Sequence, residues 1–130
     1  MQREVGALFQ STGISVNWRY TRENRGNETY SRLVVLRFTG ACRAERASKP
    51  EEAGERIVVG DTRVLKGRVL PFSEVRCDEV RRALSYLAPA ATVEQRQKAL
   101  GLAMGRVVAH ELYHVLAHTT EHTQRGLTQA

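Results

Sequence analysis

The stretch from Arg106 to His122 reads RVVAHELYHVLAHTTEH and contains the pentad HELYH, residues 110–114. On a helix, side chains four residues apart lie on one face, with about 5–6 Å between their Cβ atoms. Two imidazoles at that spacing can bind one zinc ion through bonds of about 2.0–2.1 Å. Glu111 points to the side of the pair, where a general base can reach a metal-bound water. The pentad therefore predicts a Zn²⁺ site with His110 and His114 as ligands and Glu111 as the catalytic base.

The alternative interpretation of the pentad is an ordinary amphipathic helix with two surface histidines and a glutamate. The distribution of histidine argues against it, because all four histidines of the chain fall between His110 and His122. The pentad also lies inside a segment with a clear helical pattern. The metal-site interpretation is therefore the one that we carry forward.

The third zinc ligand is harder to identify, since a catalytic zinc usually has three protein ligands and one water. On an unbroken helix His118 lies about 12 Å of rise beyond His110, so both cannot bind one ion. His122 follows two β-branched residues, Thr119 and Thr120, where the helix is expected to end. A turn there would fold His122 back to the metal. We predict His122 as the third ligand, with Glu121 and His118 as the alternatives.

The composition predicts one globular domain over residues 1–130. The chain is 42% hydrophobic and 26% charged, values typical of soluble proteins. No apolar run approaches the roughly 18–20 residues of a membrane span, so we expect no membrane partner. The N-terminal MQREVGALFQ lacks the layout of a signal peptide. Either the protein is cytoplasmic, or a signal peptide has been removed.

The net charge of +6 comes from arginine rather than lysine. A basic surface can attract nucleic acid. The arginines are scattered, however, and no dense basic tract or aromatic recognition motif accompanies them. A solvated basic surface is therefore the favoured interpretation, and we expect no nucleic-acid partner.

Cys42 and Cys77 are the two cysteines, and neither belongs to a C-x-x-C pair. A cysteine-based zinc site is therefore not expected. The two follow different strand candidates and either form one disulfide or remain two buried thiols. We favour the disulfide, which would imply an exported protein, secreted or periplasmic.

The first half of the chain alternates helix, strand and loop signals. Residues 3–10 have apolar positions at helical spacing, and residues 14–20 alternate between apolar and polar, which predicts a half-buried strand. The β-branched run at 33–38 predicts the central strand. Three short strands with turn dipeptides between them predict an antiparallel meander, at 57–59, 63–65 and 68–70. Pro71 is expected to end the meander or to place it at a sheet edge.

The second half is predicted to be helical. Asp78 can cap a helix that runs to about Leu87. Thr92 to Gln95 has the spacing of a capping box, and the helical pattern continues to about Thr119. An apolar stripe on this long helix is expected to face the sheet: Leu100, Met104, Val108, Leu112 and Val115. Small residues recur every four positions and allow another segment to approach closely: Gly101, Gly105 and Ala109.

The stretch GRVVAHELYHVLAHTTEH resembles the active-site helix of the zincin metallopeptidases, and a third histidine downstream is similar to metzincins. VLPFSEVRCDEVRRAL followed by GRVVAHELYH, together with LVVLRFTGAC, resembles a family of small secreted bacterial proteins. The resemblance implies an α+β, zincin-like fold: a small, twisted, mostly antiparallel or mixed sheet packed against a long C-terminal active-site helix. It also implies a paired Cys42 and Cys77. The metzincin pattern has glycine and histidine where this chain has Ala117 and Thr120.

The sequence thus predicts a zinc-dependent peptidase that acts on a peptide or protein substrate. Zinc would polarise the scissile carbonyl, and Glu111 would take a proton from the attacking water. The substrate is expected to lie along an edge strand near residues 63–70. The alternatives are a zinc-binding protein without peptidase activity and, less favoured, a nucleic-acid-binding domain.

Overall fold

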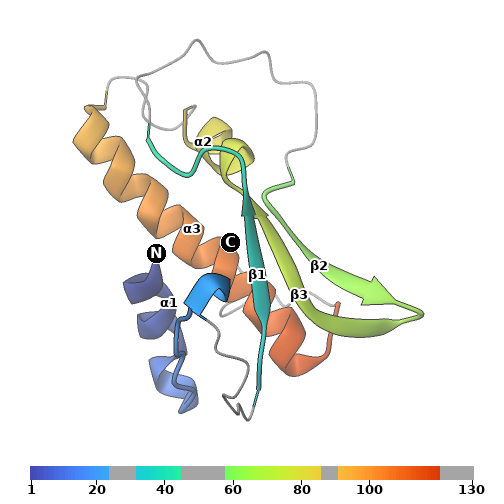
Figure 1. Cartoon of the computed structure of the whole chain (residues 1–130). Helices are drawn as coiled ribbons and strands as arrows, with labels where there is room; N and C mark the ends of the chain where they lie inside the picture. Colours follow the sequence, from blue (N-terminus) through green and yellow to red (C-terminus); the bar gives the residue numbers. More distant parts are fainter. Residues whose placement is uncertain (24–31, 45–57, 86–90, 121–130) are drawn as a thin grey trace.

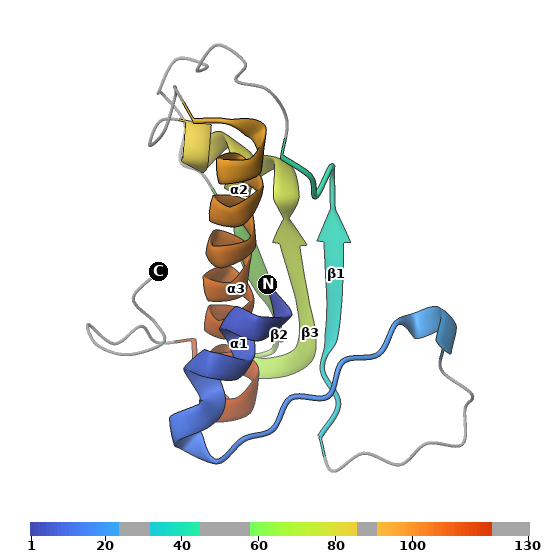
Figure 2. The same cartoon turned by 90° about the vertical axis from the view of Figure 1, so that its left-hand side faces the viewer.

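A computed structural model describes residues 1–23, 32–44, 58–85 and 91–120 of the chain. Within these ranges the fold is α+β, as predicted, and the long helix α3 runs along one face of a small mixed sheet (Figures 1 and 2). The helices are α1 (Gln2–Phe9), α2 (Cys77–Ser85) and α3 (Val93–Ala117). The strands are β1 (Val35–Thr39), β2 (Gly60–Leu65) and β3 (Arg68–Arg76). Short 3-10 turns occupy Gln10–Thr12 and Thr21–Glu23.

Helix α3 begins and packs as its sequence predicts. The Thr92 hydroxyl accepts the Gln95 main-chain N–H at 3.1 Å, and the Gln95 side chain accepts the Thr92 N–H at 3.0 Å, which completes the capping box. Every residue of the predicted stripe is buried. The helix ends at Ala117, where His118 takes a left-handed conformation with a φ of 51°.

The strand order corrects the prediction for residues 33–38. The order is β1-β3-β2, so β3 is central and β1 lies at one edge of the described sheet. Strand β1 is parallel to β3, whereas β2 is antiparallel to it. A hydrophobic run does not specify how many partners its strand has, because pairing depends on other segments; here Val35 and Phe38 each remain 36% exposed.

The predicted meander is a single hairpin of two longer strands. Lys66 and Gly67 form its turn with φ values of 51° and 75°, the positive angles that a tight hairpin turn of this type requires. Val58 and Val59 lie outside the strands, and Ile57 lies outside the described residues. Val59 still accepts a hydrogen bond from the Arg76 N–H at 2.9 Å. The strand predicted at residues 57–59 is therefore wrong.

Pro71 lies within β3 instead of ending it. The pairing moves from Thr62 opposite Ser73 to Val64 opposite Val69, so Pro71 falls in a β-bulge. The pairing with β1 begins only at Phe72. The missing N–H of proline therefore interrupts neither ladder, which explains how a central strand tolerates this residue.

The alternating segment 14–20 is not a strand. It has no ladder partner among the described residues, although Val16 and Trp18 pack against the core. Ile14 and Tyr20 are exposed, at 41% and 60% of their surface. Alternation therefore reflects one-sided packing of an extended segment here, and it carries no information about hydrogen-bonded partners.

Helix α1 packs across α3 at the small residues, as predicted (Figure 2). A Cβ atom built on Gly105 would lie 2.5 Å from the Cβ of Glu4. At Gly101 the nearest atom would be 3.6 Å away, an ordinary contact. Val5 and Phe9 of α1 are buried in the core that this approach creates.

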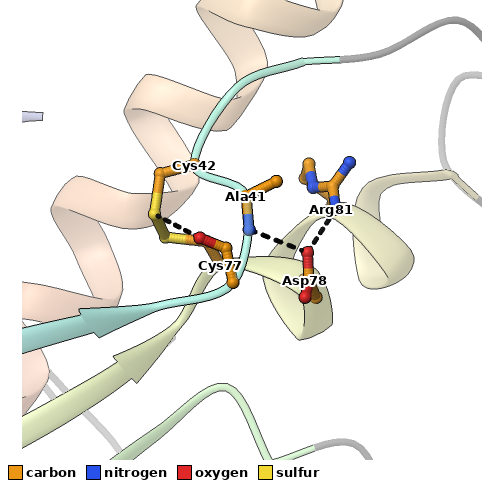
Figure 3. The surroundings of a disulfide bond; sticks show 6 residues. Ala41, Cys42, Cys77, Asp78 and Arg81 are labelled. Atoms are coloured by element: carbon orange, nitrogen blue, oxygen red, sulfur yellow. Dashed lines mark hydrogen bonds and ion pairs between the residues drawn. A yellow bond between two sulfur atoms is a disulfide. The ribbon is translucent and has the colours of Figure 1, made fainter.

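A disulfide between Cys42 and Cys77 connects the end of β1 to the start of α2 (Figure 3). The two Cα atoms are 5.0 Å apart, which is within the range for a disulfide. Of the two alternatives, a disulfide or two buried thiols, the chain therefore has the disulfide. Asp78 supports the same junction, because its carboxylate accepts the Ala41 N–H at 3.1 Å and also binds Arg81. The Arg81 guanidinium and then the Ala41 N–H hold the pKa of Asp78 below its ordinary value.

None of the helices in the described ranges combines the length and the apolar character that a membrane span would need.

The approach of α1 to α3 predicts opposite effects for two neighbouring glycines. Gly101→Ala should raise the free energy of unfolding by about 0.5–1 kcal/mol, because alanine has the higher helix propensity. Gly105→Ala should lower it by about 1–2 kcal/mol, since overpacking outweighs that gain. Urea unfolding followed by circular dichroism measures both. Equal changes in the two variants would contradict the close contact at Gly105.

The disulfide predicts a stability that depends on reductant. Reduction should lower the free energy of unfolding by about 2–4 kcal/mol, because the closed loop restricts the unfolded chain. Urea unfolding with and without reductant measures the difference, and the Cys42→Ala/Cys77→Ala double variant, which should not respond, is the control. Two free thiols in the mass spectrum of protein never exposed to reductant would contradict the bond.

Candidate metal and catalytic site

The last turns of α3 lie next to the β2–β3 hairpin and carry the predicted pentad (Figure 1). The Nε2 atoms of His110 and His114 are 3.0 Å apart, and the two rings meet edge to face. Two nitrogens bound to one tetrahedral zinc at about 2.0–2.1 Å would be roughly 3.3–3.4 Å apart. The imidazole pair therefore has nearly the spacing that a shared metal ion requires.

A turn at the end of α3 orients His114. The Nδ1 atom of His114 lies 2.7 Å from the carbonyl oxygen of Thr119, and the Thr119 N–H donates to the carbonyl of His114 at 3.1 Å. A carbonyl can only accept, so Nδ1 carries the hydrogen and Nε2 keeps its lone pair. This is the orientation that an outer carbonyl gives to a metal-binding histidine.

The left-handed His118 produces this turn. It directs the chain back along the helix, so that Thr119 and Thr120 line the same cavity as the histidine pair. The His118 side chain, one of the alternative ligands, is exposed and does not line the cavity. Arg32 also contributes at this helix end, because its guanidinium donates to the carbonyl of Leu116 at 3.1 Å. The predicted ligand His122 and its alternative Glu121 lie outside the described residues.

A cavity of about 380 Å³ lies between α3 and the hairpin. It is lined by the three predicted site residues of the pentad and by parts of both strands. Its lining consists of Gly60, Asp61, Thr62, Val64, Val69, His110, Glu111, His114, Thr119 and Thr120. The predicted substrate edge, residues 63–70, contributes Val64 and Val69 to this lining. Tyr113 lies beside His114, with the two ring centroids 5.9 Å apart.

Glu111 is 95% buried, with 5% of its surface exposed, and its carboxylate is held by the hairpin. The Thr62 hydroxyl donates to Oε2 of Glu111 and lies 2.8 Å from the hydroxyl of Ser73. Gly60 faces the other carboxylate oxygen, Oε1. Sequence reasoning missed Gly60, Thr62 and Ser73. The only signal was two small hydroxyl residues on strands whose other inward positions are apolar.

Across the described ranges 1–23, 32–44, 58–85 and 91–120, no group of three or more His, Cys, Asp and Glu side chains is arranged to hold a metal ion. The structure thus brings together two histidines that fit a zinc ion and the carboxylate beside them.

Comparisons with protein-family models, with curated proteins and with solved structures found no match to this chain. Its function is therefore argued from the geometry of the site.

Proposed function

We propose that the protein is a zinc-dependent peptidase with a zincin-like arrangement of sheet and active-site helix. The observation that supports the proposal most directly is the convergence of two imidazole nitrogens, 3.0 Å apart, beside the buried carboxylate of Glu111. All three side chains line one cavity next to an edge strand. His110, His114 and His122 would hold the ion. When bound, zinc would supply an electrophile for the scissile carbonyl and would acidify a water molecule.

Glu111 is the proton carrier in this proposal. Its carboxylate would accept a proton from the attacking water and deliver it to the leaving amine. A general base must lie within hydrogen-bond reach of the proton that it takes. Glu111 lines the cavity that holds the histidine pair, and its burial keeps competing bulk water away from the carboxylate.

The substrate would bind as an extended peptide along β2. In the described sheet, β2 pairs only with β3, so one row of its main-chain groups has no ladder partner. An added strand would be held by main-chain hydrogen bonds and would pass the cavity. This mode of binding requires little from the substrate side chains, and it therefore fits a peptide or protein substrate.

Export of the protein is part of the proposal. The Cys42–Cys77 disulfide is compatible with an oxidising compartment, such as the periplasm or the extracellular space. Disulfides are rare in the reducing cytosol, so this bond supports a secreted or periplasmic location.

The ligand assignment predicts which histidines zinc binding needs. His110→Ala and His114→Ala should each abolish stoichiometric zinc binding in equilibrium dialysis with metal analysis. His118→Ala is the matched control and should bind one zinc ion per chain. His122→Ala should weaken binding by at least about 10-fold, and Glu121→Ala should not. Full zinc binding by the His114→Ala variant would contradict the site itself. Weaker binding in Glu121→Ala but not in His122→Ala would make Glu121 the third ligand instead of His122.

The base assignment predicts that zinc binding and turnover separate. Glu111→Gln should bind one zinc ion but hydrolyse an unbiased peptide library at least about 100-fold more slowly, because the amide cannot accept the proton. Glu94→Gln, on the exposed first turn of the same helix, is the control and should be as active as the wild type. Unchanged hydrolysis in Glu111→Gln would contradict the role of Glu111. Zinc binding without any turnover by the wild type would favour the zinc-binding protein without peptidase activity.

A further inference from the structure

Strand β2 lies close to α3 at Gly60. A Cβ atom at this position would lie 2.7 Å from Oε1 of Glu111 and 2.9 Å from Cγ1 of Val107. Real Cβ atoms essentially never show such distances. The φ of Gly60 lies outside the left-handed region, so the backbone conformation does not explain the glycine. A side chain at position 60 would therefore force the Glu111 carboxylate or the Val107 side chain to shift.

Thr62 engages the other oxygen of the same carboxylate. Its hydroxyl donates to Oε2, while its second possible acceptor, the Glu111 carbonyl, lies farther away at 3.4 Å. A hydroxyl has one hydrogen to donate. With the Thr62 hydrogen on the carboxylate, the hydrogen of the 2.8 Å Thr62–Ser73 contact comes from Ser73. The chain Ser73 to Thr62 to Glu111 thus has one direction, and it ends on the carboxylate.

Gly60, Thr62 and Ser73 all lie on the paired strands of the hairpin. Thr62 and Ser73 are direct partners across the antiparallel ladder, next to the β-bulge. Ser73 is fully buried, so its hydroxyl is not exchanging this contact for bulk water. Side chains on a ladder are positioned more precisely than side chains on loops. The hairpin therefore favours a single position of the Glu111 carboxylate.

We propose that Gly60 and Thr62 are positioning residues that clamp the Glu111 carboxylate in a single rotamer facing the cavity. The orientation itself is a property of the folded chain. Its use in proton transfer rests on the peptidase function proposed above. A base that is displaced by about 1 Å can cost about 100-fold in rate, so the clamp would act on the chemical step rather than on substrate binding.

The orientation is tested in the metal-free protein by NMR. Three-bond couplings report the χ1 and χ2 angles of Glu111 in the wild type and in Thr62→Val, Thr62→Ser and Thr39→Val. We expect one rotamer in the wild type, averaged couplings in Thr62→Val, and one rotamer again in Thr62→Ser, which keeps the hydroxyl. Thr39→Val makes the same substitution on β1, away from the cavity, and should leave Glu111 unchanged. Averaged couplings in the wild type, or one rotamer in Thr62→Val, would overturn the clamp.

The consequence for turnover is measured on the zinc-loaded protein. Thr62→Val should lower kcat by about 10- to 100-fold with KM and zinc stoichiometry unchanged, and Thr62→Ser should recover most of the rate. Gly60→Ala, which fills the space beside Oε1, should lower kcat in the same way. A loss of stability in Thr62→Val with kcat unchanged would overturn the positioning role. A wild-type protein that hydrolyses nothing but shows the coupling pattern expected above supports the clamp and contradicts the peptidase.

Discussion

The close approach of β2 to the last turns of α3 is the contact on which the candidate site depends. Gly60 contributes no side chain, so the strand backbone can lie against Glu111 and Val107. A buried carboxylate is costly unless it is hydrogen-bonded, and the Thr62 hydroxyl supplies that bond. The hairpin therefore compensates for the burial of Glu111 and at the same time forms one wall of the cavity.

The position of α3 is determined by contacts far from the site. Its first turn is closed by the capping box at Thr92 and Gln95. Gly105 allows α1 to pack directly on the helix. The apolar side chains of the stripe from Leu100 to Val115 are buried. The disulfide at Cys42 and Cys77 ties α2 to the end of β1, next to the same core.

The histidine pair and Glu111 have different surroundings in the candidate site. His110 and His114 present converging nitrogens toward the cavity, and the Thr119 carbonyl decides which nitrogen of His114 carries hydrogen. Glu111 lies one residue from His110 on the helix, and its carboxylate accepts a hydrogen bond from the Thr62 hydroxyl of the hairpin. Two neighbouring positions of one helix thus have different hydrogen-bond partners, as the proposed division into ligands and base requires.

The elements that depend on local spacing were predictable from the amino-acid sequence. The capping box, the buried stripe of α3, the meeting of His110 with His114 and the end of the helix near Thr119 all follow from helical geometry within a few residues. The hairpin turn at Lys66 and Gly67 belongs to the same class. For Cys42 and Cys77 the residues left two alternatives, and the fold decided between them by bringing the two Cα atoms to 5.0 Å.

Contacts between distant parts of the chain were decided only by the tertiary structure. Alternation in residues 14–20 predicted a strand, but pairing needs a partner that the segment itself does not specify. Pro71 is tolerated in the central strand because a bulge and the start of the β1 ladder meet at that point. Thr62 and Glu111 are 49 residues apart, so no local pattern connects them. The sequence by itself determined the helix and the spacing of His110 and His114, because both follow from the regular turn of one helical segment. The surroundings of Glu111 were decided by how β2 packs on that helix.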